Sequence, residues 1–392
     1  MAIAIASPAL LEPVVASAQV QAPGVRSESG RVRTLPLTKF YDTPDPVPAG
    51  KPGDLIRSQP FDEYELPLSV SAVRILYHSR SAAGEDVAVS GVVLFPYDKQ
   101  PPRGGWPVIA WAHAATGVAR QCAPSLMRNI GHGPFLSMYV NLGYAVVATD
   151  YAGLGTHFRN AFLDGPSNAT DVINSVPAAR AAVPQLGARW IVVGETEGAL
   201  AAMVVADKES EIRDPNYLGA IAISLLANAR ETYEHPVNGS ASATLPSLAY
   251  GIKTVYPQFR ITDVLTDKAL ALYKQLEQTC SPTRTTPDWS AAEIVNPAWE
   301  ANPFVHRYFD RNELGTTRAY GPIFVITGDA DPAIPPTIRA QAFARICKQG
   351  DRVQWERYPN LDAGRVMGDS VRDQIGWIEA RFAGRAAPTN CP

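Results

Sequence analysis

The stretch that decides the fold is Trp190–Ala202, which reads WIVVGETEGALAA. Its first four residues, Trp190–Val193, have the length and apolar character of a buried strand, and an Ala-rich segment suited to a helix follows the turn Gly194–Gly198. The two glycines allow the strand and helix backbones to approach each other closely around the central residue, Thr196. The pattern predicts a nucleophile elbow, Gly-x-Ser-x-Gly, with threonine in place of the serine.

Two later segments follow in the order that such an elbow requires. Residues 322–335, PIFVITGDADPAIP, form an apolar strand and a turn that places Asp331 at the end of the strand. Residues 353–358 predict another strand, and it leads into Asn360–Gly364, where a catalytic histidine is expected and Ala363 stands. The order nucleophile, acid and histidine position therefore holds, although only the acid has its usual identity.

Strands and helices alternate along most of the chain. Eight short segments rich in Val and Ile predict strands: Val73–Tyr77, Val87–Leu94, Pro107–Ala112, Ala145–Thr149, Trp190–Val193, Leu218–Leu225, Ile323–Thr327 and Val353–Tyr358. Helix-length segments lie between or after them: Ala169–Ala182, Glu197–Asp207, Pro336–Ile346 and Ser370–Phe382. This alternation predicts an α/β protein with a mostly parallel eight-stranded sheet and helices on both faces.

Composition divides the chain into three parts. Residues 1–53 predict a leader and an extended arm rich in Pro and Gly, and residues 54–227 with 304–392 predict the α/β core. The alternation of strands and helices stops in residues 228–303, which are aromatic, polar and helical in short pieces. We therefore expect this insertion to be a cap or lid over the carboxyl edge of the sheet.

Over nearly its whole length the chain resembles the secretory lipases of bacteria and fungi, the group of fungal lipase A. The elbow and acid turn carry the resemblance together with further blocks: AVSGVVLFP (88–96), PVIAWAHAATGVARQCAPS (107–125), GYAVVATDYAGLGT (143–156) and RFAGRAAPTNC (381–391). The resemblance implies the α/β-hydrolase fold with an inserted cap. It also implies that Asp331 is the triad acid and that His113–Gly117 is the loop that supplies oxyanion-binding amides.

The site departs from that family at several positions. Ala363 can neither take nor return a proton, so an ordinary acyl-enzyme cycle is not expected. Ala114 stands where glycine is usual, and Glu195 and Glu197 replace uncharged or imidazole residues beside the elbow. Because the changes cluster in one pocket, they indicate divergence of the whole site.

Five residues are candidates for chemistry, each with a structural alternative. Thr196 is either a nucleophile or a small polar residue at a helix start, and Glu195 and Glu197 are either an acid and base or ion-paired carboxylates. Asp331 without a histidine to orient is either a base or a turn-stabilising residue. His113 is the candidate substitute base, or it braces its loop.

Binding residues are predicted around the same turn. The backbone amides of Ala114, Ala115 and Glu197 are candidate oxyanion donors, and Tyr151 is a candidate pocket-lining hydroxyl. The histidines show no metal-binding spacing, so neither a metal nor another cofactor is predicted.

Bulk properties exclude several functions. A net charge of −3 and the lack of a dense basic run exclude a nucleic-acid partner, and no apolar stretch is long enough to predict a membrane-spanning helix. The four cysteines, Cys122, Cys280, Cys347 and Cys391, predict either two disulfides or four unreactive thiols. The N-terminus is either a degenerate secretory signal or a disordered leader, which leaves cytoplasmic and secreted locations open.

Three functional hypotheses follow. In the first, the lipase scaffold binds an apolar or acyl-bearing small molecule and promotes cyclisation, elimination or rearrangement without hydrolysis. In the second, the protein binds a ligand without turnover. In the third, it is a weak esterase that depends on Thr196.

Overall fold

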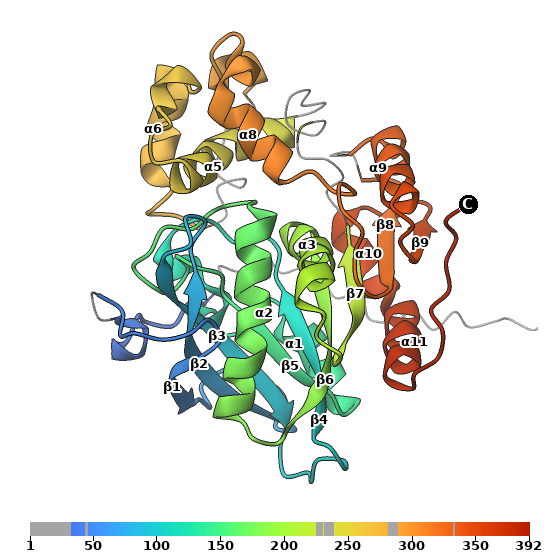
Figure 1. The fold of residues 1–392 in the computed structure, drawn as a ribbon. Helices are drawn as coiled ribbons and strands as arrows, with labels where there is room; N and C mark the ends of the chain where they lie inside the picture. The colour runs from blue at the N-terminus through green and yellow to red at the C-terminus, as the bar shows by residue number, and fades with distance from the viewer. Residues whose placement is uncertain (1–32, 44–45, 225–229, 231–238, 281–288, 332–333) are drawn as a thin grey trace, which may run out of the picture. The chain divides into compact units, whose positions relative to one another are not determined.

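A nine-stranded mixed sheet forms the centre of residues 33–392 (Figure 1). The computed structural model describes residues 33–43, 46–224, 230, 239–280, 289–331 and 334–392. The strands are β1 Leu55–Pro60, β2 Val70–Arg80, β3 Asp86–Pro96, β4 Trp106–Ala112, β5 Ala145–Thr149, β6 Leu186–Glu195, β7 Tyr217–Ile223, β8 Ile323–Gly328 and β9 Val353–Tyr358. Residues 1–32 of the predicted leader and arm, and the predicted strand end at Leu225, lie outside the described residues.

The strand order is β1-β2-β3-β5-β4-β6-β7-β8-β9. Strands β1, β2, β3 and β5 pair antiparallel, and all pairings from β5 to β9 are parallel. The mostly parallel sheet is therefore confirmed, but it has nine strands and not eight. The strand missed by the sequence pattern is β1, which pairs with β2 as an exposed or half-buried edge.

The helices are α1 Gly133–Asn141, α2 Gly165–Ala182, α3 Glu197–Ile212, α5 Gly239–Val255, α6 Asp267–Gln275, α7 Ala291–Ile294, α8 Pro303–Arg311, α9 Pro336–Lys348, α10 Ala363–Asp369 and α11 Val371–Phe382. Short 3-10 helices are η1 Lys39–Tyr41, η2 Arg120–Cys122, η3 Pro124–Leu126, η4 Ile261–Asp263 and η6 Trp299–Ala301. Among the described residues, no helix has the length and apolar character that crossing a bilayer requires.

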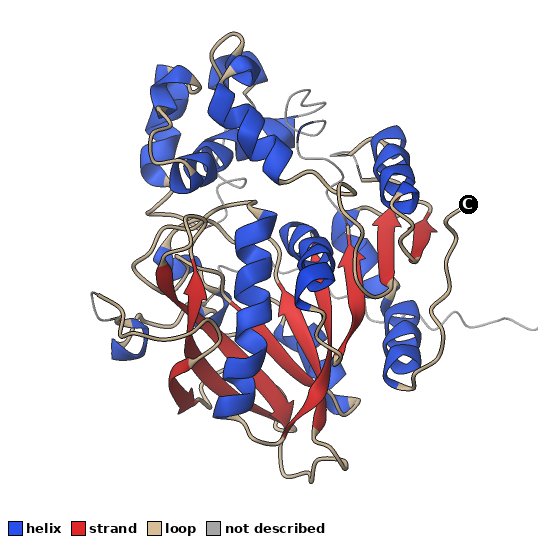
Figure 2. Ribbon diagram, viewed as in Figure 1, coloured by secondary structure: helices blue, strands red, loops and turns tan. Residues whose placement is uncertain are grey.

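Both faces of the sheet are covered (Figure 2). Helices α2 and α3 bury apolar residues against one face, where Val172 and Val205 are fully buried. Helices α1 and α11 cover the other face with residues such as Tyr139 and Ile378. The core therefore consists of two apolar layers separated by the sheet.

The insertion forms a small helical cap with its own apolar cluster (Figure 1, top). Helices α5, α6, α7 and α8 contribute to this cluster, which also includes Val118, Phe162 and Leu163 of the core. These core residues lie in the loops that follow β4 and β5, so the cap packs on the carboxyl edge of the sheet. The cluster also includes Val305, Tyr308 and Phe309 of α8.

Polar contacts hold the cap to the core at the start of α2. The buried carboxylate of Asp164 accepts hydrogen bonds of 2.7 and 3.1 Å from Arg311, at the end of α8. The next residue, Asn312, accepts a 2.7 Å hydrogen bond from the amide of Gly165. In addition, Tyr308 donates to the carbonyl oxygen of Phe162.

The four cysteines form two disulfides, which settles the alternatives left by the sequence. Cys122, in the core loop after β4, is bonded to Cys280 of the cap. Cys347, at the end of α9, is bonded to Cys391 in the C-terminal segment. One bridge therefore joins cap to core, and the other fastens the C-terminal segment to α9.

Candidate active site

Thr196 occupies a strained turn between β6 and α3. Its φ of +49° and ψ of −106° lie outside the regions that L-residues favour, which for a β-branched side chain costs roughly 1 to 3 kcal/mol. Its amide donates a 2.9 Å hydrogen bond to the carbonyl oxygen of Ile223 at the end of β7. The elbow geometry predicted from the sequence is therefore retained with threonine at its centre.

The two glycines of the elbow are required by the packing of backbone on backbone. A Cβ atom at Gly194 would lie 1.9 Å from the carbonyl oxygen of Gly198, and one at Gly198 would lie 1.9 Å from that of Ala112. Both oxygens belong to the backbone, so neither can move aside as the end of a flexible side chain could. Strand β4, strand β6 and helix α3 therefore fix the turn from three sides.

The hydroxyl of Thr196 has no hydrogen-bond partner among the residues that the structure describes. The side chain is half-buried and does not cap α3. A triad would place an imidazole against this hydroxyl. Ala363, where the sequence pattern predicts the histidine position, is the first residue of α10 and carries only a methyl group.

The loop with Ala363 nevertheless lies beside the elbow. Ser224, which directly follows β7, donates a 3.1 Å hydrogen bond from its hydroxyl to the carbonyl oxygen of Ala363. The preceding residue, Ile223, is the one that accepts the hydrogen bond from Thr196. Thr196 and Ala363 are thus attached to consecutive residues, Ile223 and Ser224, at the end of one strand.

Asp331 follows β8, as predicted, but its carboxylate faces a cation. Oδ2 of Asp331 lies 3.3 Å from the guanidinium of Arg339 on α9. Arg339 also donates hydrogen bonds to the carbonyl oxygens of Gly328, at 2.8 Å, and Asp331, at 3.2 Å. Burial of Arg339 lowers the pKa of its guanidinium, which the nearby carboxylate partly offsets. The position of the acid is thus fixed by Arg339.

Glu197 is buried at the first turn of α3. Its Oε1 accepts a 2.7 Å hydrogen bond from the amide of Leu163 and a 3.0 Å hydrogen bond from the side-chain amide of Asn168. Burial raises the pKa of this carboxyl to about 7, although the hydrogen bonds act in the opposite direction. The site therefore contains a carboxyl that titrates near neutrality, and it is linked through Leu163 to the loop on which the cap packs.

Glu195 is paired with a histidine that sequence reasoning did not select. Its Oε2 lies 3.1 Å from Nε2 of His132, at ion-pair distance but without the orientation of a hydrogen bond. His132 immediately precedes α1, a helix that the sequence pattern did not reveal. The Gly-Pro pair at Gly133 and Pro134, which suits a first helical turn, is the signal that identifies this start.

His113, the predicted substitute base, faces backbone on both sides of its ring. Nδ1 lies 2.6 Å from the carbonyl oxygen of Ala114, and Nε2 lies 3.1 Å from that of Asp150. Burial lowers the pKa of the imidazole to about 4, so it is neutral at physiological pH. His113 therefore supports the loop after β4, and the structure shows no contact between its ring and Thr196.

Tyr151, the predicted pocket-lining hydroxyl, is also part of this support. Its ring is stacked on His113 with the centroids 4.2 Å apart, and its hydroxyl donates a 3.1 Å hydrogen bond to the carbonyl oxygen of His113. With 1% of its surface exposed, the side chain lies inside the core. The predicted oxyanion residues are more accessible, because Ala114 is half-buried and Ala115 is exposed.

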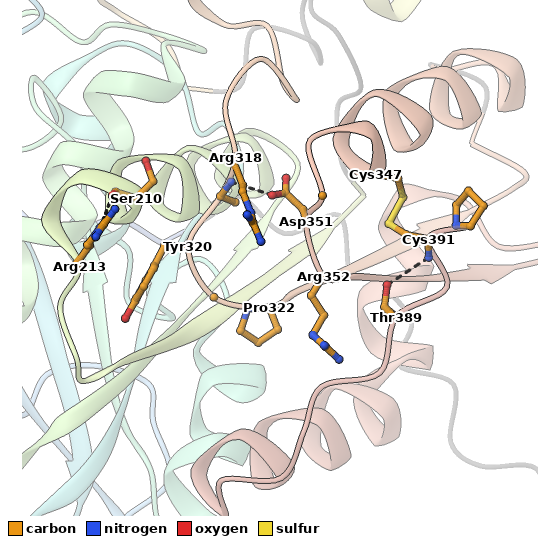
Figure 3. Close-up of a pocket in the computed structure, with 14 residues that line it drawn as sticks. Ser210, Arg213, Arg318, Tyr320, Pro322, Cys347, Asp351, Arg352, Thr389 and Cys391 are labelled. Atoms are coloured by element: carbon orange, nitrogen blue, oxygen red, sulfur yellow. Dashed lines mark hydrogen bonds between the residues drawn. A yellow bond between two sulfur atoms is a disulfide. The ribbon is translucent and has the colours of Figure 1, made fainter.

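A separate cavity of about 1090 Å³ lies at the opposite edge of the sheet (Figure 3). It is lined by residues that precede β8 and β9, including Arg318 and Asp351, and by the end of α3. Figure 3 shows Arg318 beside Asp351, and the Cys347–Cys391 disulfide forms another part of the wall. None of the predicted site residues lines this cavity.

The sheet order, the elbow and the inserted cap define an α/β-hydrolase. Candida antarctica lipase A in its closed state has the same fold, with a TM-score of 0.76 at 18% identity, covering 92% of this chain and 89% of that one. The rice cell wall degrading esterase LipA from Xanthomonas oryzae gives a TM-score of 0.70 at 19% identity, covering 85% of this chain and 98% of that one.

Sequence comparison gives the family. Lipase 6 of Candida albicans is 22% identical over 402 residues, which cover 90% of this chain and 82% of that protein. The family model described as secretory lipase matches residues 133–390. The chain therefore belongs to the secretory lipase family, a family of lipase and esterase enzymes, as its sequence blocks suggest.

Proposed function

We propose that this lipase-like protein binds an apolar or acyl-bearing small molecule beneath its cap and promotes a non-hydrolytic reaction of it. Cyclisation, elimination and rearrangement are the reaction classes that the site supports best. Each needs a shaped pocket, proton transfer and stabilisation of developing charge, but none needs an acyl-enzyme.

The observation that carries the proposal is that no imidazole of the described residues is hydrogen-bonded to the hydroxyl of Thr196. Ala363 offers no imidazole to the hydroxyl of Thr196, and the ring of His113 faces backbone carbonyl oxygens. Asp331, the acid that would orient such an imidazole, is placed against Arg339. Because loss of a triad member typically lowers turnover about 10⁴-fold or more, hydrolysis through Thr196 is disfavoured.

What remains at the site suits chemistry on a carbonyl-bearing ligand. The strained turn keeps the amide of Glu197 at the start of α3, where it is a candidate donor to a developing oxyanion together with Ala114 and Ala115. The carboxyl of Glu197 has a pKa near 7 because it is buried, so both of its protonation states are accessible at neutral pH. The helical cap packs on the same edge of the sheet.

A serine-directed fluorophosphonate probe tests the proposal. We expect no labelling of the wild-type protein at Thr196 and no hydrolysis of p-nitrophenyl butyrate above the level of a Thr196→Ala variant. A long-chain fluorescent fatty acid should nevertheless bind both proteins, because binding needs the cap and pocket but no nucleophile. Stoichiometric labelling at Thr196, or ester hydrolysis that the Thr196→Ala change abolishes, would overturn the proposal.

One observation favours a second function, a weak esterase that depends on Thr196. The threonine keeps the strained dihedral angles of a nucleophile, and its hydroxyl is engaged by no described residue. Strain retained at one residue is a property of functional sites. The ester assay with the Thr196→Ala control separates this function from the first.

A further inference from the structure

An imidazole and a carboxylate meet beside the elbow at a place that the triad of the family does not use. Nε2 of His132 lies 3.1 Å from Oε2 of Glu195, and Glu195 is the residue directly before Thr196. The carboxylate side chain is 8% exposed and the imidazole side chain 30% exposed. A buried acid is thus paired with a base that solvent or a ligand can reach.

The backbone explains why these side chains meet. Trp111 and Ala112 at the end of β4 pair with Val193 and Gly194 at the end of β6. The ring of His132 packs edge-on against Trp111, with the centroids 5.9 Å apart. His132 therefore lies at the carboxyl edge of β4 and β6, the edge from which the elbow projects.

The orientation of the ring leaves one nitrogen available. When Nε2 carries the proton and faces the carboxylate, Nδ1 of the neutral ring carries a lone pair. Within the described parts of the chain, no hydrogen bond engages Nδ1, and the ring does not cap α1. A carboxylate at ion-pair distance from an imidazole favours its protonated form, as in sites where the imidazole acts as a base, although the present pair is not aligned as a hydrogen bond.

Each of the other described histidines either contacts a side chain outside the elbow or faces backbone carbonyl oxygens. His78 pairs with Asp86 at 3.1 Å between β2 and β3, His157 contacts Thr43, and His306 lies 2.9 Å from the guanidinium of Arg230. His113 faces two carbonyl oxygens. Of the described histidines, His132 alone combines a carboxylate partner, partial exposure and a position at the elbow.

We propose that His132 and Glu195 are the proton-transfer pair of this site. Nδ1 of His132 takes a proton from a C–H or O–H group of the ligand and returns it to the rearranged or cyclised product. Glu195 is a positioning residue that holds the ring and balances the positive charge of the imidazolium. The proton lost by the ligand is the proton gained by the product, so no co-reactant is needed.

This inference rests on the proposed function, in which the site moves protons without an acyl intermediate. The competing interpretation is that the pair only fastens the start of α1 to the elbow. In that case, loss of the pair would lower stability, while the folded protein would keep its reactivity toward a substrate that needs only a base.

The Kemp elimination of nitrobenzisoxazole by the full-length protein tests the inference. A base removes the ring C–H proton, the N–O bond breaks, and the cyanonitrophenolate product is followed by its absorbance. We expect saturable acceleration by the wild type and a decrease of at least about tenfold in His132→Ala. Added imidazole should restore the rate of this variant saturably, whereas a purely structural role gives no rescue.

Glu195 and a matched pair elsewhere provide the controls. Glu195→Gln should lower the rate several-fold, and Glu195→Asp should keep more of it, because a carboxylate remains. Asp86→Asn breaks the His78 pair, which has the same 3.1 Å separation far from the elbow, and should leave the rate unchanged. Circular dichroism verifies that each variant is folded, and His132→Gln replaces His132→Ala if the latter is not.

The outcomes separate the inference from the proposed function. No acceleration by the wild type, or an unchanged rate in a folded His132 variant, overturns the inference. The elimination needs no nucleophilic attack and no acyl-enzyme. Fluorophosphonate labelling at Thr196 together with a His132-dependent elimination would therefore overturn the proposed function and support the proton-transfer pair.

Discussion

The hydroxyl of Ser224 donates a hydrogen bond to the carbonyl oxygen of Ala363, with 3.1 Å between the two oxygens. Because the residue before Ser224 accepts the amide hydrogen bond of Thr196, the end of β7 holds the elbow and the loop with Ala363 together. The loop that contains Ala363 therefore lies beside the elbow.

We predict that the double variant Thr196→Ser with Ala363→His gains ester hydrolysis. A histidine at 363 starts from a loop that β7 already positions, and Asp331 follows the adjacent strand. A gain of at least about 10²-fold in p-nitrophenyl butyrate turnover over wild type is expected, well below the full contribution of a triad because Arg339 shares Asp331. Each single variant is the control, and a double variant no faster than either would show that the inherited geometry is lost.

We predict that Gly198→Ala destabilises the protein by at least about 2 kcal/mol. The added Cβ would lie 1.9 Å from the backbone oxygen of Ala112, which cannot move without disturbing β4. Gly376→Ala in α11 is the matched control, because nothing lies within 4 Å of its Cβ and alanine favours a helix by up to about 1 kcal/mol. Urea unfolding measures both, and equal effects of the two changes would contradict the packing argument.

We predict that Glu197→Gln flattens the pH dependence of stability. Burial raises the folded-state pKa of Glu197 from 4.5 to about 7, so the folded protein binds this proton more tightly than the unfolded chain does. Its contribution is fully present below about pH 4.5 and is lost as the pH rises through about 7, amounting to about 3 kcal/mol at most.

Urea unfolding between pH 4.5 and 8 measures this effect. As the pH rises from 4.5 to 8, the free energy of unfolding should decrease more for the wild type than for Glu197→Gln. In this variant the amide oxygen can still accept the hydrogen bonds from Leu163 and Asn168. Glu293→Gln is the control, since hydrogen bonds from Lys268 and Ser290 lower the pKa of this exposed carboxyl to about 2. If the free energy of unfolding changes with pH in the same way in wild type and Glu197→Gln, Glu197 is not the source of the pH dependence.

We predict that Arg339→Met destabilises the acid turn by about 2 to 4 kcal/mol. The change removes hydrogen bonds to the carbonyl oxygens of Gly328 and Asp331 and takes a buried cation away from a carboxylate. Arg357→Met is the control, because that arginine pairs with Asp329 at a half-exposed position, where such pairs contribute less than about 1 kcal/mol. Thermal unfolding of both variants checks the difference, and similar losses would refute it.

We predict that removing the disulfide between cap and core costs more than removing the other one. In the chain-entropy model the longer loop contributes more, and the sequence separations of 158 and 44 residues differ by about 1 kcal/mol in that model. Cys122→Ala with Cys280→Ala is compared with Cys347→Ala with Cys391→Ala by urea unfolding. A larger loss in the second pair would show that loop closure does not dominate.

The local sequence pattern was sufficient to predict the buried strands and the elbow. The parallel strands and the elbow around Thr196 follow from short apolar runs bounded by glycines. Strand β1 was missed because its residues, Leu55–Pro60, are half-buried or exposed and follow an arm rich in Pro and Gly. Helix α1 was missed because its short segment is apolar on several faces and so shows no helical period, although Gly133 and Pro134 mark its start.

The partners of the site residues could not be predicted, because they come from segments that are distant in the sequence. The sequence placed Glu195 and Asp331 at the site, but their partners, His132 and Arg339, depend on how helices dock on the sheet. Likewise, the sequence showed that His113 lies in the loop after β4, but not that both of its nitrogens face carbonyl oxygens. Such contacts follow from tertiary packing and leave no periodic signal in the sequence.

The contact between the two glycines of the elbow also bears on how the scaffold can be reused. Gly194 packs on Gly198 and Gly198 packs on Ala112, so the turn is held without help from the side chain at its tip. The side chain at position 196 can therefore be exchanged, for example for a cysteine thiol, while its backbone support stays the same. The backbone geometry of the elbow therefore does not depend on which side chain stands at its centre.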